Sequence, residues 1–194
     1  MLMDALEEHL YGMEKALSEK NAWVTSIHEA GHSLIAYLQN QSPPIYVTRV
    51  CRENHLGYTF LGESNDDVSP SKQTLLNRIS VFMGGAAAEL LLFDEMSSGG
   101  CGDLQQATNI ARKMVTKFGM GSRLATATFS ENDVKSSQNL DEIDSILKIQ
   151  LETAKRMLSE HKNELLVIAN ALMERKSLNA DELTEVLLSC QTII

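Results

Sequence analysis

The sequence is poor in positive charge, in aromatic residues and in proline. It carries 17 Lys and Arg against 26 Asp and Glu, a formal net charge of −9. This balance excludes nucleic acid as the main partner, because binding phosphates needs a basic surface. With only 5% aromatic residues, the core must consist of aliphatic side chains and methionine, which favours helices over a β-sandwich. A length of 194 residues, 43% of them hydrophobic, predicts a single folded domain over residues 1–194.

The sequence also has no closely spaced cysteine pair and no long uninterrupted apolar run. The 3 cysteines are far apart and form no C-x-x-C pair, which argues against a disulfide framework and predicts the cytoplasm or another reducing compartment. The most apolar stretch, residues 81–93, is interrupted by two glycines and Glu89 and is too short to cross a bilayer. The acidic N-terminus lacks the apolar region of a secretory signal. We therefore expect no membrane segment in this chain.

The first third of the chain predicts a helix followed by two short strands. Residues 1–20 are expected to form a helical lead-in. Residues 21–38 carry apolar side chains at helical spacing and are followed by Pro43 and Pro44, which cannot continue a helix. Residues 45–51 and 57–61 are β-branched or aromatic and roughly alternate in polarity, so they predict two strands of a small sheet.

The middle of the chain predicts a buried helix and a glycine-rich loop. Residues 71–93 predict a helix that is apolar nearly all round over residues 81–92, which indicates burial. Gly84 and Gly85 within this helix would let another backbone approach closely. Residues 97–102 are expected to form a flexible loop, and Asp103 stands where the N-cap of the next helix belongs.

The last part of the chain, residues 139–190, predicts a bundle of amphipathic helices. Leucines recur at helical spacing from Leu147 to Leu158. Asn179 followed by Glu182 is typical of a capping box at the start of the last helix. The expected fold is mainly α, with a small β-sheet near the N-terminal third, a core over residues 21–120 and a C-terminal helical bundle.

The chemistry is concentrated in the sequence H-E-A-G-H at residues 28–32. On a helix, His28 and His32 lie one turn apart on the same face and can reach one tetrahedral zinc ion. Glu29 projects beside the ion, where its carboxylate can take a proton from zinc-bound water. Ala30 and Gly31 are small, which we expect to leave room for substrate. A solvated polar face is the alternative, but the flanking residues are apolar, and burying these groups without a metal ion would be costly.

A catalytic zinc ion usually takes a third protein ligand. The residues themselves leave several candidates open: His55, Glu63, Glu89 and Asp103. His55, at the tip of the predicted hairpin, and Glu63, at the end of the second strand, are more easily explained as solvent-exposed residues. Glu89 lies within an apolar helix and must be paired, for which orienting a ligand histidine is a natural role.

Several segments together resemble the peptidase domain of the FtsH family of membrane-tethered, ATP-dependent zinc metalloproteases. H-E-A-G-H at residues 28–32 and L-G-Y-T-F at 56–60 are similar to its zinc and edge-strand motifs. G-G-A-A-A-E at 84–89 and the run S-S-G-G-C-G-D-L-Q-Q-A-T at 97–108 are similar to two further motifs. The likeness covers about residues 21–188, with matching order and spacing.

The resemblance implies a ligand set and a mechanism. Asp103 would be the third ligand, with His28 and His32, of one zinc ion per chain. Glu29 would be the general base, and Glu89 a supporting carboxylate that orients a ligand histidine. The sequence departs from the family pattern near these positions, with Gly102 in place of an asparagine, but no ligand and no base is lost.

The resemblance also implies how substrate and partners bind. Gly57, Tyr58, Thr59 and Phe60 would belong to an edge strand to which substrate adds in extended form. A homo-oligomer, a hexamer by likeness, is expected. No Walker A pattern, G-x-x-x-x-G-K-[ST], occurs, so we expect no ATP hydrolysis by this chain, which would stand alone or be an excised domain.

The expected function is a zinc-dependent endopeptidase that cleaves unstructured polypeptide. The alternative is a non-catalytic zinc-containing module that binds peptides or proteins and is derived from a protease. The intact Glu29 favours the enzyme, because a purely structural metal site needs no base.

Overall fold

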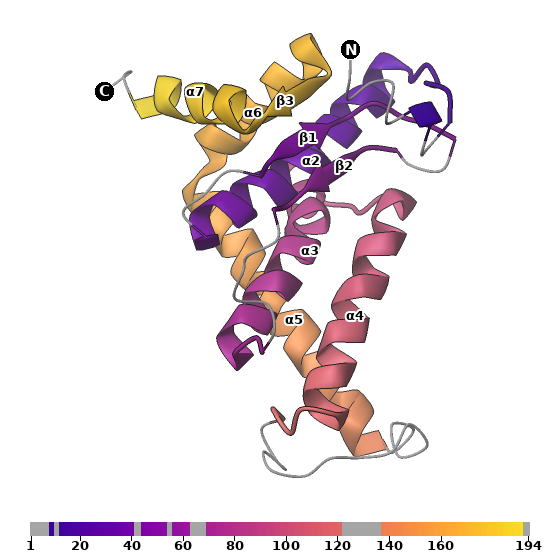
Figure 1. Cartoon of the computed structure of the whole chain (residues 1–194), viewed down its shortest axis with the longest axis vertical. Helices are drawn as coiled ribbons and strands as arrows, with labels where there is room; N and C mark the ends of the chain where they lie inside the picture. The colour runs from indigo at the N-terminus through magenta and orange to yellow at the C-terminus, as the bar shows by residue number, and fades with distance from the viewer. Residues whose placement is uncertain are drawn as a thin grey trace.

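A computed structural model describes residues 8–9, 12–40, 44–53, 56–62, 69–121 and 137–191. The described chain is mostly helical, with a small antiparallel sheet that covers helix α2 at one end of the molecule (Figure 1). Helices α3, α4 and α5 extend from there towards the other end, and α6 and α7 lie beside the sheet. This arrangement confirms the mainly α fold with a small sheet and helical C-terminal part.

Helices α2 (Glu19–Asn40) and α3 (Lys72–Phe93) form the centre of the molecule. They cross at two glycines: a Cβ atom added at Gly31 would lie 2.3 Å from the carbonyl oxygen of Gly84. Gly84 therefore admits a neighbouring backbone, as predicted. The expectation for Gly31 was wrong, because this residue faces α3 and makes no room for substrate. Ser71 caps α3 by accepting a hydrogen bond from the backbone N–H of Thr74.

By length and apolar content, α3 is also the one described helix that could cross a membrane. Of its most apolar 18-residue window, 61% is buried inside the molecule. Its neighbours are α2, α4 and α5, so its environment is that of a core helix.

The sheet consists of β1 (Tyr46–Thr48) in the middle, with β2 (Tyr58–Phe60) and β3 (Ser177–Asn179) on either side, all antiparallel. The first two strands were predicted, although both are shorter than expected. The third was not, because the segment before Asn179 was interpreted only as the approach to a helix. Asn179 and Glu182 do form the predicted capping box, each accepting a hydrogen bond from the other's backbone N–H, at the start of α7 (Ala180–Gln191).

Helix α4 (Cys101–Thr116) begins earlier than predicted. The expected flexible loop is a short 3-10 turn, η1 (Ser98–Gly100), whose cap Ser97 accepts a hydrogen bond from the N–H of Gly99. Since the chain continues from this turn directly into α4, Gly100 is the N-cap. The prediction of Asp103 as N-cap was therefore wrong, and Asp103 lies within the first turn of the helix.

In its described part, the predicted N-terminal lead-in is only partly helical, and residues 1–7 and 10–11 of it lie outside the described residues. Residues 8–9 and 19–20 are helical, whereas residues 12–18 are not. Gly12 has a φ of +84°, which a regular helix does not accommodate. The backbone of the next residues runs beside the segment that follows β1: Glu14 forms an antiparallel bridge with Arg52, and Lys15 donates its N–H to the carbonyl of Cys51 at 2.8 Å.

The C-terminal helices α5 (Ser137–Glu160), α6 (Lys162–Arg175) and α7 complete the core. Leu158 of α5, Leu165 and Leu172 of α6 and Leu183 of α7 are fully buried. Helix α5 packs against α3 and α4, and α6 packs against α2. The helix that carries H-E-A-G-H is thus enclosed by α3, α6 and the sheet.

Candidate metal centre

His28 and His32 lie one turn apart on α2 and face the same way, with ring centroids 4.7 Å apart. Both are buried. The Nδ1 atom of His28 lies 2.7 Å from Oε1 of Glu89, and Nδ1 of His32 lies 2.7 Å from the backbone carbonyl of Val81. A carbonyl only accepts hydrogen bonds, so His32 carries its proton on Nδ1. Nδ1 of His28 is engaged by Glu89 in the same way. The Nε2 atoms of His28 and His32 can therefore act as metal ligands.

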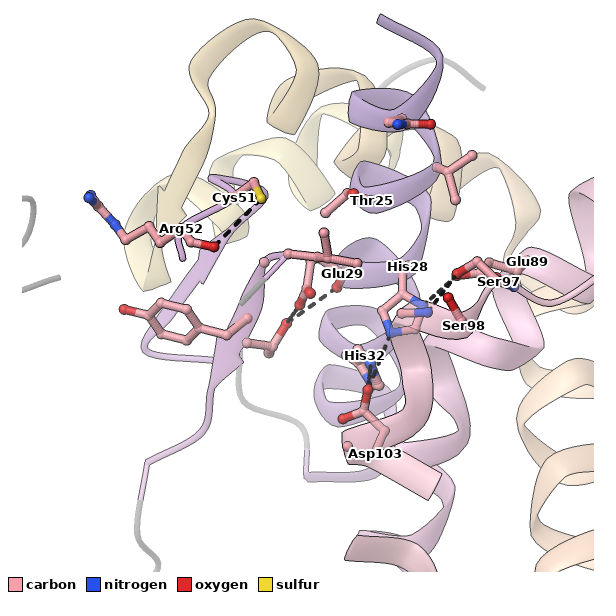
Figure 2. A pocket seen from close by; sticks show the side chains of 18 of the residues that line it. Thr25, His28, Glu29, His32, Cys51, Arg52, Glu89, Ser97, Ser98 and Asp103 are labelled. Carbon is pink, nitrogen blue, oxygen red and sulfur yellow. Dashed lines mark hydrogen bonds and ion pairs between the residues drawn. The ribbon is translucent and has the colours of Figure 1, made fainter. Parts of the chain in front are cut away.

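Asp103 reaches these Nε2 atoms from the first turn of α4 (Figure 2). Its Oδ2 atom lies 3.3 Å from Nε2 of His28 and 3.4 Å from Nε2 of His32. Ligands about 2.0–2.1 Å from a tetrahedral zinc ion are about 3.3–3.4 Å apart. Potential ligand atoms of the three residues all lie within 4.8 Å of one another. The donor set and its spacing therefore fit a zinc ion.

The charges of these groups also favour a cation. Burial opposes protonation of His28, but hydrogen bonds to Asp103 and Glu89, with the nearby charge of Glu29, raise its pKa to about 10. Burial disfavours the ionised carboxylate of Asp103, yet its contacts with His28 and His32 hold its pKa well below the usual range. Carboxylates thus surround the two imidazoles, and a divalent cation would supply the positive charge that otherwise has to come from protons.

Glu89 is held in place by the turn that precedes α4. Its carboxylate, 2% exposed, accepts hydrogen bonds from the backbone N–H of Ser97 and from the Ser97 hydroxyl, the latter at 2.9 Å. Burial alone would raise its pKa, but His28 and Ser97 lower it. Glu89 is therefore an ionised acceptor that fixes the ring of His28.

Two glycines make space for that ring. A Cβ atom at Gly85 would lie 2.3 Å from Nε2 of His28, and one at Gly100 would lie 3.2 Å from its Cε1. Gly85 is therefore needed to accommodate the ring of His28, which its position in the sequence did not predict.

Glu29 lies beside the three candidate ligands (Figure 2). It is 5% exposed, and its Oε2 atom accepts a hydrogen bond of 2.8 Å from the hydroxyl of Thr59 on β2. Burial raises the pKa of its carboxyl group, although the charges of His32 and His28 and the bond from Thr59 oppose this. A raised pKa makes a carboxylate a better proton acceptor, as a general base requires.

The candidate ligands open into a cleft of about 970 Å³. Strand β2 forms one wall, and the predicted strand residues Gly57, Tyr58 and Thr59 line it, together with Leu56 and Leu61. Phe60 does not contribute to this wall, and its side chain is half exposed. Among the described strands, β2 pairs with β1 alone, so the side of β2 away from β1 is an outer edge of the described sheet.

The structure thus brings together His28, Glu29, His32, Glu89 and Asp103. His55 and Glu63, the other candidates for a third ligand, lie outside the described residues. Besides the glycines that make space for His28, sequence reasoning missed three contributors: the Val81 carbonyl, Ser97 and the side chain of Thr59. Of these three, only Ser97 could have been anticipated from the sequence. A serine two residues before a glycine can cap a turn, which would have placed a turn at residues 97–99.

The chain is similar to known proteins over most of its length. The model of peptidase family M41 matches residues 15–186. The ATP-dependent zinc metalloprotease FtsH 2 of Methylacidiphilum infernorum is 32% identical over 95% of this chain and 32% of its own length. Human ATP-dependent zinc metalloprotease YME1L1 is 36% identical over 88% of this chain and 23% of its own length. The chain spans about a third or less of the length of these relatives.

Proposed function

The chain belongs to peptidase family M41, and on that premise we propose that it is a zinc-dependent endopeptidase. His28, His32 and Asp103 hold the ion, and Glu29 is the general base. One observation carries the proposal. The Oδ2 atom of Asp103 lies almost equally far from the two Nε2 atoms, while both Nδ1 atoms are engaged elsewhere.

Each residue has a separate part in the proposed reaction. When bound, zinc supplies Lewis-acid polarisation of the scissile carbonyl and makes an attacking water more acidic. Glu29 accepts the proton of that water and passes it to the leaving amine. Glu89 keeps the ring of His28 in a fixed orientation and tautomer.

The substrate is an extended segment of polypeptide. It adds to the outer edge of β2 through the backbone of Gly57, Tyr58, Thr59 and Phe60, as an extra antiparallel or parallel strand. This places a peptide bond over the cleft that contains Glu29. The proposed substrates are peptides and unstructured segments, whose backbone can take the extended form that pairing with a strand edge requires. Assembly into a homo-oligomer, a hexamer by likeness to the FtsH family, is part of the same proposal.

Replacing Glu29 with Gln tests this function. The variant should bind zinc as the wild type does, because Glu29 is not among the ligands. Cleavage of an unfolded casein substrate should fall by about 100-fold or more, the usual contribution of a general base. Zinc per chain and the initial rate of cleavage, with and without a chelator, are the measurements.

Glu185→Gln is the matched control, since this glutamate is exposed on α7 and should leave the rate unchanged. Cleavage by Glu29→Gln at the wild-type rate, or cleavage that survives removal of zinc, would contradict the proposal. Zinc and peptide binding without any cleavage by the wild type would favour a non-catalytic binding module.

A further inference from the structure

Thr59 is a polar residue in an otherwise apolar row of the sheet. In the register of the strands, Thr59 lies opposite Val47, and Val47 lies opposite Leu178. Val47 and Leu178 are completely buried, as expected on the face of the sheet that covers α2. The third position in this row, that of Thr59, would ordinarily hold an apolar side chain, but the side chain of Thr59 carries a hydroxyl group.

That hydroxyl group contacts the carboxylate of Glu29. Thr59 Oγ1 donates to Oε2 of Glu29 at 2.8 Å, which is good hydrogen-bond geometry. The other carboxylate oxygen, Oε1, faces Gly57, where an added Cβ atom would lie only 2.9 Å away. Both oxygens of Glu29 are therefore adjacent to the same short segment, one bonded by a hydroxyl and the other given room by a glycine.

We propose that Thr59 is a positioning residue, whose hydroxyl group fixes the orientation of the Glu29 carboxylate for proton transfer. This inference rests on the proposed function and deepens it. The strand that pairs with substrate through its backbone also orients the base through a side chain. Substrate and base are thereby placed by one rigid element, and a small error in the placement of a reacting group can cost about 100-fold in rate.

This role predicts a specific kinetic pattern for Thr59→Val, which keeps the shape of the side chain and removes the hydroxyl group. We expect kcat to fall by about 10- to 100-fold while KM changes little, because the backbone edge that pairs with substrate is intact. Thr59→Ser restores the hydroxyl group and should recover most of kcat. Thr153→Val is the control, since Thr153 is half-buried on α5, far from the candidate site in sequence, and its hydroxyl group donates to the carbonyl of Ile149 in the same helix.

A binding measurement separates positioning from substrate recognition. In the Glu29→Gln background, which should not cleave, the affinity for a fluorescent unfolded peptide is measured by anisotropy with and without Thr59→Val. Equal affinities and equal zinc content are expected, since the hydroxyl group touches neither the candidate ligands nor the outer edge of the strand.

Other outcomes would overturn the inference. An unchanged kcat for Thr59→Val would show that the hydroxyl group does not matter for catalysis, while the proposed function would stand on the Glu29→Gln result. An equal loss of kcat in Thr59→Ser, or a weaker peptide affinity with kcat unchanged, would assign Thr59 to packing or to substrate binding. A wild type without chelator-sensitive cleavage would overturn both the proposed function and this role.

Discussion

His28 has a carboxylate at each ring nitrogen, Glu89 at Nδ1 and Asp103 at Nε2. Without a metal ion, these neighbours favour the protonated imidazolium, which explains its raised pKa. A metal ion needs the same Nε2 atom without a proton. Protons and zinc therefore compete at one atom, and the pH dependence of the protein should differ between the metal-free and zinc-bound forms.

For metal-free protein, we expect the free energy of unfolding to fall as the pH rises from 6.5 towards 10. The pKa of His28 is about 10 in the folded protein, against an ordinary value of 6.5. The folded state thus holds this proton more tightly than the unfolded chain. The resulting stabilisation is complete below pH 6.5 and is lost as the pH approaches 10. Urea unfolding of chelator-treated protein across this range measures the change.

Zinc affinity, measured by competition with a chelator, should change in the opposite direction and increase with pH, because fewer protons compete. Asp103→Asn is the informative variant: without this negative charge, the stability of the metal-free protein should depend less on pH. If metal-free stability rose between pH 6.5 and 10, or zinc affinity did not depend on pH, the competition at Nε2 would be refuted.

At the scale of elements, α2 and α3 can pack closely because glycines stand where the two helices cross. Gly31 and Gly84 bring the two backbones together, and Gly85 gives His28 its space. The helix with the candidate ligands can therefore approach the helix that supplies Glu89 and the Val81 carbonyl. Each glycine costs helix propensity relative to alanine, a cost that close packing offsets here.

Gly31→Ala should destabilise the protein by about 1–3 kcal/mol or more, the usual effect of overpacking a close contact. The new methyl group would meet the rigid backbone oxygen of Gly84. Gly102→Ala is the matched control, because a Cβ atom there meets nothing within 4 Å. That variant should be neutral or slightly more stable. Chemical denaturation of both variants is the measurement, and equal stabilities would contradict the close crossing of α2 and α3.

At the scale of the whole molecule, the candidate site joins segments that are far apart in the sequence. His28 and His32 come from α2, Asp103 from α4, Glu89 from α3, and Thr59 from the sheet. A zinc ion would connect α2 to the N-terminal end of α4 without involving α6 or α7. Its removal should therefore loosen one region and leave the other unchanged.

Hydrogen exchange with and without zinc tests this expectation. Removal of zinc should speed amide exchange in the first turns of α4, where Asp103 loses its partner ion. Exchange in α6 should change little, because Leu165, Ile168 and Leu172 are fully buried there. A uniform increase over both helices would mean that zinc stabilises the whole fold, and no change in α4 would argue against Asp103 as a ligand.

Much of the fold followed from the sequence because it depends on residues close together along the chain. The spacing of His28 and His32 places them on one face of any helix. Asn179 and Glu182 form the predicted capping box through bonds over three residues. Asp103 was misplaced as an N-cap, since the 3-10 turn before α4 depends on Ser97, which is itself tied to Glu89.

The sequence by itself determined the helical character of the chain, the histidine pair with its adjacent glutamate, and the family likeness that singled out Asp103. Only the tertiary structure decided that β3 completes the sheet, that Gly31 faces Gly84, that Val81 orients His32 and that Thr59 reaches Glu29. Periodicity and capping are local properties of a chain, whereas these contacts join residues 30 or more positions apart. Such pairs are specified by the packing of the whole core, which no short pattern encodes.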